Sequence, residues 1–166
     1  MDYLSASANF NSLCEELGQQ LLMRQWHVAT AESCTGGGLA AAITQVAGSS
    51  QWFECGIVSY ANRIKQQVLQ VNAEALTSDG AVSEAVVIQM VRGVLLLSDA
   101  DIAVAISGIA GPSGGSDGKP VGTVWFAWAL ASGETRTELF HFGGDRVQVQ
   151  YQAVEQGLLG LLKFFI

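Results

Sequence analysis

The stretch HVATAESCTGGGLAAAITQVAG, from His27 to Gly48, predicts a strand that passes directly into a helix. Its first residues, 27–31, have the pattern of a short buried strand, and the alanine-rich part over about 36–46 indicates a helix. Between these segments lie a carboxylate, two hydroxyls, a thiol and three consecutive glycines. A strand-to-helix turn can expose such groups in a crevice, so this junction is the first candidate for a functional site.

The composition predicts a single domain over residues 1–166. Hydrophobic residues make up 49% of the chain and charged residues 14%, so a sizeable core is available without disulfides. The three cysteines, an odd number, are typical of reduced thiols. Neither a signal peptide nor an apolar run of about 20 residues is present, so we expect a cytoplasmic protein with no membrane partner.

The net charge of −7 argues against a nucleic-acid partner, because the chain has only eight Lys and Arg residues and no basic stripe. No spacing of Cys, His, Asp and Glu supports a metal site. The apolar C-terminal residues LLKFFI, 161–166, favour a homodimer.

Periodicity and turn signals predict helices that alternate with strands, followed by a hairpin. The expected helices cover 7–24, about 36–46, 62–71 with Asn62 as its cap, the run from Ser83 to Leu97, and a C-terminal segment opened by GGDR, 143–146. The expected strands cover 27–31, 55–61, 101–108 and the two segments that flank Ser132-Gly133. This order predicts an α/β fold, a three-layer α/β/α domain with a mixed β-sheet, whose ligands bind at the carboxyl ends of the strands.

Ser33 is a candidate nucleophile because a serine at this turn can point its hydroxyl into the crevice. The backbone N–H groups of Cys34, Thr35 and Gly36 would lie at a helix start, where they could hold an oxyanion with help from the positive helix end. The alternative is that Ser33 or Thr35 only caps the helix. The two interpretations are compatible, since one hydroxyl can cap while the other attacks.

A serine nucleophile needs a base, and both histidines are poorly placed: His27 begins a buried strand and His141 ends a hairpin strand. Lys65, in the first turn of a helix, is a better candidate. Its pKa would have to fall from about 10.4 to about 7–8, and burial and a neighbouring positive helix end could both lower it. The alternative is an ordinary solvated surface lysine.

Three further side chains near this junction could take part. The Tyr60 phenol could bond to the nucleophile or the substrate, or be an ordinary half-buried aromatic. Cys34 is a competing nucleophile, because a thiol at a helix N-terminus has a lowered pKa. Glu32 could orient a neighbouring group or cap backbone donors.

The segment GGDR, 143–146, could form a phosphate site from a helix N-terminus and Arg146, although a capped helix with a surface arginine has the same pattern. The loop over 109–122, with five glycines and two prolines, does not have the Walker A spacing but could present backbone N–H groups to an anion.

Taken together, six ordered motifs resemble the CinA C-terminal domain family over nearly the whole chain. They are TAESCTGG (30–37), AGSSQWF (47–53), GIVSYANRIK (56–65), GAVSE (80–84), SGIAGPSGGSDGKPVGTVWFA (107–127) and GGDR (143–146). The resemblance implies hydrolysis of nicotinamide mononucleotide to nicotinic acid mononucleotide and ammonia, without metal or cofactor, in the recycling of pyridine nucleotides.

The resemblance also implies roles for particular residues. Ser33 would be the nucleophile, Lys65 the general base, and Tyr60 a helper near the nucleophile. Backbone donors from Cys34 to Gly36 would form the oxyanion hole. Substrate contacts would come from Arg146 and the 107–111 loop, which holds Ser107, Gly108 and Gly111. The alternative function is a nucleotide-binding or regulatory module of the same fold without catalysis.

Overall fold

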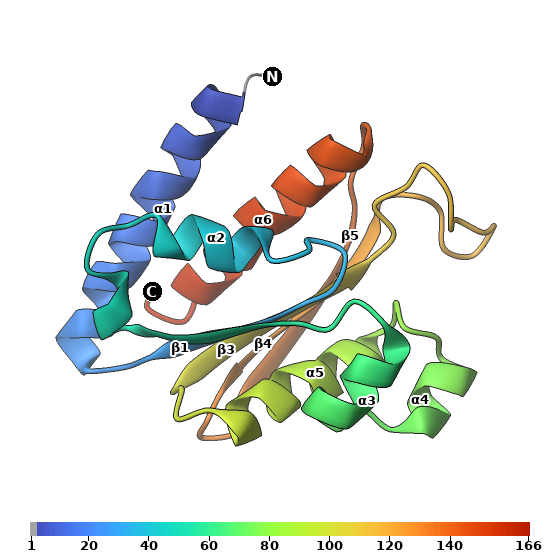
Figure 1. Ribbon diagram of the computed structural model, residues 1–166, viewed down its shortest axis with the longest axis horizontal. Helices are drawn as coiled ribbons and strands as arrows, with labels where there is room; N and C mark the ends of the chain where they lie inside the picture. The colour runs from blue at the N-terminus through green and yellow to red at the C-terminus, as the bar shows by residue number, and fades with distance from the viewer. Residues whose placement is uncertain (1–2) are drawn as a thin grey trace.

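The computed structural model describes residues 3–166, with side chains from Phe10 onward. The helices are α1 (Tyr3–Arg24), α2 (Gly38–Thr44), α3 (Asn62–Leu69), α4 (Ala73–Ser78), α5 (Glu84–Leu97) and α6 (Arg146–Leu162), with a 3₁₀ turn at Ser49–Gln51. The strands are β1 (Val28–Glu32), β2 (Phe53–Val58), β3 (Ile102–Gly108), β4 (Thr123–Leu130) and β5 (Thr135–His141). Helices α1, α2 and α6 cover one face of the sheet, and α3, α4 and α5 cover the other (Figure 1). The predicted three-layer α/β arrangement is confirmed.

The sheet is mixed, with the strand order β2-β1-β3-β4-β5. Strand β1 pairs in parallel with β2 and β3, whereas β4 and β5 run antiparallel to their neighbours. The carboxyl ends of the three parallel strands therefore meet at one edge of the sheet. The segments that follow these ends come together there, as the sequence predicts.

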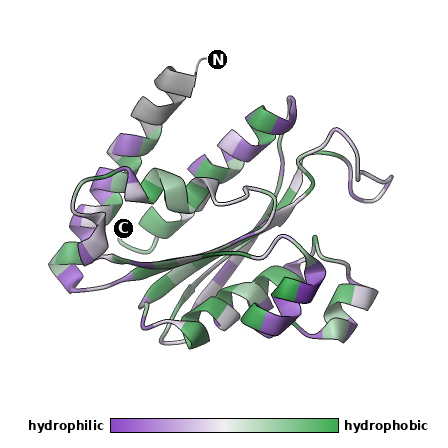
Figure 2. Ribbon diagram, viewed as in Figure 1, coloured by the Kyte–Doolittle hydropathy of each residue, from purple (hydrophilic) through white to green (hydrophobic). Residues whose placement is uncertain are grey.

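The two faces of the sheet carry side chains of different size. Toward α5 the central strands present a layer of buried alanines: Ala29, Ala31, Ala103, Ala105, Ala127 and Ala129. Toward α1, α2 and α6 they present larger residues such as Ile106, Phe126 and Trp128. Small side chains let a helix lie close to a sheet, and α5 contacts the alanine layer through Val87, Met90 and Val94, among others. Figure 2 shows hydrophobic residues along the strands and both hydrophobic and hydrophilic residues on the helices that cover them.

Several helix ends follow the expected capping rules. The Ser83 hydroxyl accepts the Val86 N–H and caps α5, as predicted. The predicted hairpin is also present, but its turn is longer than the expected two residues, because the Leu130 N–H donates to the Glu134 carbonyl and residues 131–133 lie between them. The predicted cap at Asn62 is wrong: α3 already begins at Asn62, and Ala61 occupies the cap position without a side-chain hydrogen bond.

Other element boundaries differ from the prediction by a few residues. Strand β2 ends at Val58, so Ser59 and Tyr60 lie beyond the strand and not inside it. Helix α2 begins at Gly38, so Cys34, Thr35 and Gly36 belong to a turn before the helix. Helix α4 was not predicted, because its six residues are too few to show a periodic pattern.

The apolar C-terminal residues that favoured a homodimer largely pack against other parts of the same chain. Leu161 and Leu162 are buried in the core, and the Phe165 ring packs near the Trp26 ring, with centroids 6.1 Å apart. The Arg136 guanidinium lies over the Phe164 ring, 4.1 Å from its centroid. These contacts weaken the argument for a homodimer, which stays a prediction. Among the described residues, no helix is long and apolar enough to cross a membrane.

Gly93 of α5 gives a direct test of how α3, which carries Lys65, packs on α5. A Cβ at this position would collide with the Leu69 carbonyl at the end of α3. We expect Gly93→Ala to lower the free energy of unfolding by about 1–3 kcal/mol. Each kcal/mol lowers the Tm by about 2–4 °C in a chain of this size.

The matched control is Gly118→Ala, because a Cβ at Gly118 meets no atom within 4 Å. Thermal unfolding followed by circular dichroism compares the two variants. Equal Tm values would contradict the described contact between α3 and α5.

Candidate active site

The candidate site lies where the parallel strands end. The Ser33 N–H, just beyond β1, donates to the Ile106 carbonyl of β3 at 2.9 Å, and the Ser59 N–H, just beyond β2, donates to the Glu32 carbonyl at 2.8 Å. A cavity of about 340 Å³ opens at this edge. Most of the predicted site residues line it: Ser33, Cys34, Tyr60, Lys65, Ser107, Gly108, Gly111 and Arg146.

Ser33 and Lys65 form the central contact of this cavity. The Lys65 Nζ lies 2.9 Å from the Ser33 Oγ, 2.6 Å from the Ser59 carbonyl oxygen and 3.4 Å from the Tyr60 carbonyl oxygen. Lys65 is only 1% exposed, so it is not the surface lysine of the alternative interpretation. Among the described side chains, no carboxylate forms an ion pair with it.

The surroundings of Lys65 favour its neutral form. Burial lowers the pKa of Lys65, and the nearby Cys34 side chain only partly opposes this. The second cause that the sequence suggested, a positive helix end, does not come from α2, because the Leu39 and Ala40 N–H groups in its first turn donate to the Glu32 carboxylate. Lys65 lies in the first turn of α3, which has no acidic residue there.

The same contacts settle how α2 begins. Its cap residue is Gly37, which has no side chain, and Glu32 accepts the N–H groups that a capping hydroxyl would otherwise take. The Thr35 hydroxyl donates to Glu32 at 2.7 Å, and the Ser33 hydroxyl faces Lys65. The interpretation of Ser33 or Thr35 as a helix cap is therefore wrong.

A hydrogen bond within the turn occupies one of the three predicted oxyanion donors. The Gly36 N–H donates to the Ser33 carbonyl at 3.1 Å, so this donor serves the turn itself. The positive φ of Gly36, 63°, explains why the turn needs glycine there. Cys34 and Thr35 stay as the predicted sources of backbone N–H groups for an oxyanion.

Cys34 does not have the properties of a nucleophile. Burial raises the pKa of the Cys34 thiol to about 12, although the backbone N–H groups of Cys34 and Thr35 and the charge of Lys65 act in the opposite direction. The expected lowering of this pKa by a helix N-terminus is wrong, because α2 begins four residues later and its first donors bind Glu32.

Arg146 joins two sides of the cavity mouth. Its Nη1 donates to the Gly111 carbonyl at 2.8 Å and its Nη2 donates to the Tyr60 hydroxyl at 3.0 Å. The phenol of Tyr60 is thus directed toward Arg146, and the carbonyl of Tyr60 is the group that contacts Lys65. Helix α6 begins at Arg146 and is capped by Asp145 in a capping box with Gln148.

The remaining predicted residues line the same cavity. The Ser107 hydroxyl donates to the Ala81 carbonyl at 2.7 Å, which ties the end of β3 to the loop before α5. At Gly108, a Cβ would press on the Val124 side chain. Gly111 has a φ of 83°, which favours glycine.

Comparison with known proteins identifies the family of the chain. The family model described as the CinA C-terminal domain matches residues 10–165. The chain belongs to the CinA C-terminal domain family. It is 53% identical to nicotinamide-nucleotide amidohydrolase PncC of Escherichia coli (strain K12) over 154 residues, 93% of each chain. It is 51% identical to nicotinamide-nucleotide amidohydrolase PncC of Pseudomonas putida, covering 92% of this chain and 94% of that relative.

A solved structure of the same family has the same fold. The crystal structure of competence/damage inducible protein CihA from Agrobacterium tumefaciens superposes with a TM-score of 0.93 at 38% sequence identity, covering 95% of this chain and 96% of that one.

Two residues of this CinA domain support the site but could not be found from the sequence. The Ser59 carbonyl accepts the shortest hydrogen bond of Lys65, and the Gln150 side chain of α6 donates to the Cys34 carbonyl at 2.7 Å. A backbone carbonyl leaves no signal in a sequence, and Gln150 lies 116 positions from Cys34. The histidines lie outside the lining of this cavity, with the Nδ1 of His141 3.3 Å from the Thr123 hydroxyl.

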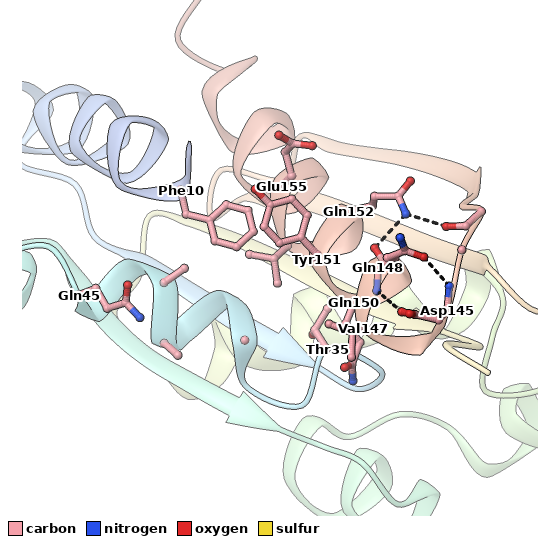
Figure 3. A pocket seen from close by; sticks show the side chains of 16 residues that line it. Phe10, Thr35, Gln45, Asp145, Val147, Gln148, Gln150, Tyr151, Gln152 and Glu155 are labelled. Carbon is pink, nitrogen blue, oxygen red and sulfur yellow. Dashed lines mark hydrogen bonds between the residues drawn. The ribbon is translucent and has the colours of Figure 1, made fainter. Parts of the chain in front are cut away.

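A second, larger hollow of about 780 Å³ lies between α1, α2 and α6 (Figure 3). Phe10, Gln45 and Tyr151 are among its lining residues, and Thr35 is the only residue of the 33–37 turn that lines it. Figure 3 shows the capping hydrogen bonds of Asp145 and Gln148 at its rim. Neither Ser33 nor Lys65 lines this hollow, so the reactive groups point to the smaller cavity.

The raised pKa of Cys34 leads to a measurable result. At pH 8 the thiolate fraction of a thiol with a pKa near 12 is about 10³-fold lower than that of an ordinary cysteine. We expect iodoacetamide to leave Cys34 unmodified in the folded protein and to modify it rapidly in urea, as followed by peptide mass mapping. Rapid modification of Cys34 in the folded protein would contradict this description of the turn.

Proposed function

We propose that this chain is an amidohydrolase that converts nicotinamide mononucleotide to nicotinic acid mononucleotide and ammonia by a Ser/Lys mechanism. The observation that carries the proposal is the 2.9 Å contact between the Ser33 hydroxyl and a fully buried Lys65 amine. The substrate follows from the relatives of more than 50% identity, which are named nicotinamide-nucleotide amidohydrolases.

In the first step, neutral Lys65 removes the proton of the Ser33 hydroxyl while the Ser33 oxygen attacks the amide carbon. The amide carbon is electron-poor because it is attached to a pyridinium ring. A C–O bond forms and the carbonyl oxygen becomes an oxyanion. Backbone N–H groups of Cys34 and Thr35 are the proposed donors to this oxygen.

In the second step, the tetrahedral intermediate breaks its C–N bond. The protonated Lys65 gives its proton to the leaving amine, which departs as ammonia and leaves an ester on Ser33. A water molecule, deprotonated by Lys65, then attacks the ester and releases the acid and the Ser33 hydroxyl. Because the ammonium form of Lys65 keeps its hydrogen bonds to the Ser59 and Tyr60 carbonyls, the lysine can carry the proton between the two steps without moving.

Substrate binding depends on local positive charge, because the chain as a whole is strongly negative. Lys65 and Arg146 are the two basic side chains that line the cavity. Lys65 lies at the reacting end, so we assign the phosphate of the substrate to Arg146, whose guanidinium lies at the mouth between Gly111 and Tyr60.

We place this reaction in the recycling of pyridine nucleotides in the cytoplasm, and we propose a homodimer as its assembly. The competing function, a nucleotide-binding module without turnover, gives no reason for a lysine buried without a carboxylate partner beside a serine. Burying an amine without such a partner lowers the free energy of unfolding, and this cost brings no benefit to a module that only binds.

Ammonia release from nicotinamide mononucleotide tests the proposal directly. We expect the wild-type protein to release ammonia with or without a chelator. Ser33→Ala should lower kcat by at least about 10⁴-fold, because the nucleophile is lost. The matched control is Ser49→Ala, which removes another buried serine remote from the cavity and should leave kcat unchanged.

Turnover retained by Ser33→Ala would refute the nucleophile. Binding of the nucleotide by a wild-type protein that releases no ammonia would support the binding module instead.

Arg146 provides a separate test of the phosphate assignment. Arg146→Lys keeps the charge but loses the fork of donors, so KM for nicotinamide mononucleotide should rise about 10- to 100-fold, with a smaller change in kcat. The wild-type protein should also bind nicotinamide riboside, which lacks the phosphate, more weakly by a similar factor. Equal KM values of the wild-type protein for nucleotide and nucleoside would refute the assignment.

A further inference from the structure

Glu32 is a fully buried carboxylate that none of the proposed steps uses. It is the last residue of β1 and lies directly before Ser33. Its side chain is on the same face of the sheet as α2, since the neighbouring β1 positions Ala29 and Ala31 face α5. A buried carboxylate costs free energy unless donors surround it, so its partners indicate what it does.

All partners of the Glu32 side chain are donors from the catalytic turn, from α2 or from β1 itself. Its Oε2 accepts the Thr35 hydroxyl at 2.7 Å and the backbone N–H groups of Gly37 and Leu39 at 3.1 Å each. Its Oε1 accepts the Ala40 N–H at 2.9 Å and the Thr30 hydroxyl at 3.4 Å. One side chain thus binds the middle and the end of the 33–37 turn and the first turn of α2.

The main chain of Glu32 holds the other half of the reactive pair. Its carbonyl oxygen accepts the Ser59 N–H at 2.8 Å and the Ser59 hydroxyl at 3.4 Å. The carbonyl of Ser59 in turn accepts the shortest hydrogen bond of Lys65. Glu32 therefore connects the position of the nucleophile to the position of the base.

We propose that Glu32 is a positioning residue for catalysis: its carboxylate sets the shape of the 33–37 turn, and thereby the direction of the Ser33 hydroxyl and of the Cys34 and Thr35 N–H groups. This proposal rests on the proposed amidohydrolase function. Glu32 touches neither substrate nor base through its side chain, and it acts by holding the groups that do.

The physical reason is that the turn is rich in glycine and depends on hydrogen bonds for its shape. Residues 36–38 are three glycines, of which Gly36 and Gly37 have positive φ values of 63° and 97°. A glycine-rich segment has many accessible conformations, so its order must come from hydrogen bonds. Glu32 supplies acceptors for three backbone N–H groups and one hydroxyl of the turn and of the first turn of α2.

Glu32→Gln is the first variant that tests this. The amide keeps the shape of the side chain but places an NH₂ group against N–H donors of the turn. We expect kcat for nicotinamide mononucleotide to fall about 10²-fold with little change in KM, because a small displacement of the nucleophile affects the chemical step and leaves the substrate pocket intact. The control is Trp128→Phe, which loses a buried hydrogen bond to the Gly157 carbonyl far from the cavity and should lower the Tm with kcat unchanged.

Thr35 supplies a second pair of variants that does not alter Glu32. Thr35→Val removes the hydroxyl that donates a hydrogen bond to Glu32, and Thr35→Ser keeps that hydroxyl. We expect Thr35→Val to lower kcat and Thr35→Ser to restore most of it. If Glu32→Gln and Thr35→Val lower only the Tm, as Trp128→Phe does, the positioning role is refuted.

A second readout separates this proposal from the proposed function. A fluorophosphonate probe reacts with an activated serine by displacement of fluoride, whatever the natural substrate is. We expect wild-type Ser33 to be labelled, and Glu32→Gln to be labelled much more slowly, as followed by intact mass. Labelling that depends on Glu32 in a protein that releases no ammonia would overturn the substrate and retain the positioning role. Ammonia release by the wild-type protein, together with equal labelling of the wild-type and Glu32→Gln proteins, would retain the proposed substrate and refute the positioning role.

Discussion

The contact between the Ser33 hydroxyl and the Lys65 amine depends on the exclusion of water from Lys65. An exposed lysine would be protonated at neutral pH and could not accept the serine proton. Burial of the amine removes this obstacle, because desolvation disfavours the ammonium form. The cost of burying it is limited by the Ser59 and Tyr60 carbonyls, which accept hydrogen bonds from either protonation state.

The fold provides this environment through its three parallel strands. Strand β1 carries Ser33 at its carboxyl end, and β2 delivers the Ser59 and Tyr60 carbonyls next to it. Helix α3 then brings Lys65 back over the end of β2, and its packing on α5 holds the lysine in place. The alanine layer beneath α5 lets these helices lie close to the sheet. The site is thus a consequence of strand order and of side-chain size on one face of the sheet.

Much of this arrangement could be predicted from the sequence, and for physical reasons. The nearly continuous apolar run of β3 and the alternation of helices and strands indicate a covered, largely parallel sheet, which fixes the edge where ligands bind. The motifs around Ser33 and Lys65 identify the reactive pair. The sequence does not show that α2 binds a carboxylate at its start, because that depends on the direction in which Glu32 leaves β1. For this reason the expected lowering of the Cys34 pKa by a helix N-terminus is wrong.

The most direct measurement is the titration of Lys65 itself in the folded protein. The ¹³Cε and Nζ resonances of Lys65, assigned by comparison with Lys65→Met, report its protonation state as the pH is raised. The account predicts a midpoint well below that of an ordinary lysine, about 10.4. A Lys65 that titrates with the midpoint of an ordinary lysine would contradict the account, because the base would then be protonated when the serine has to react.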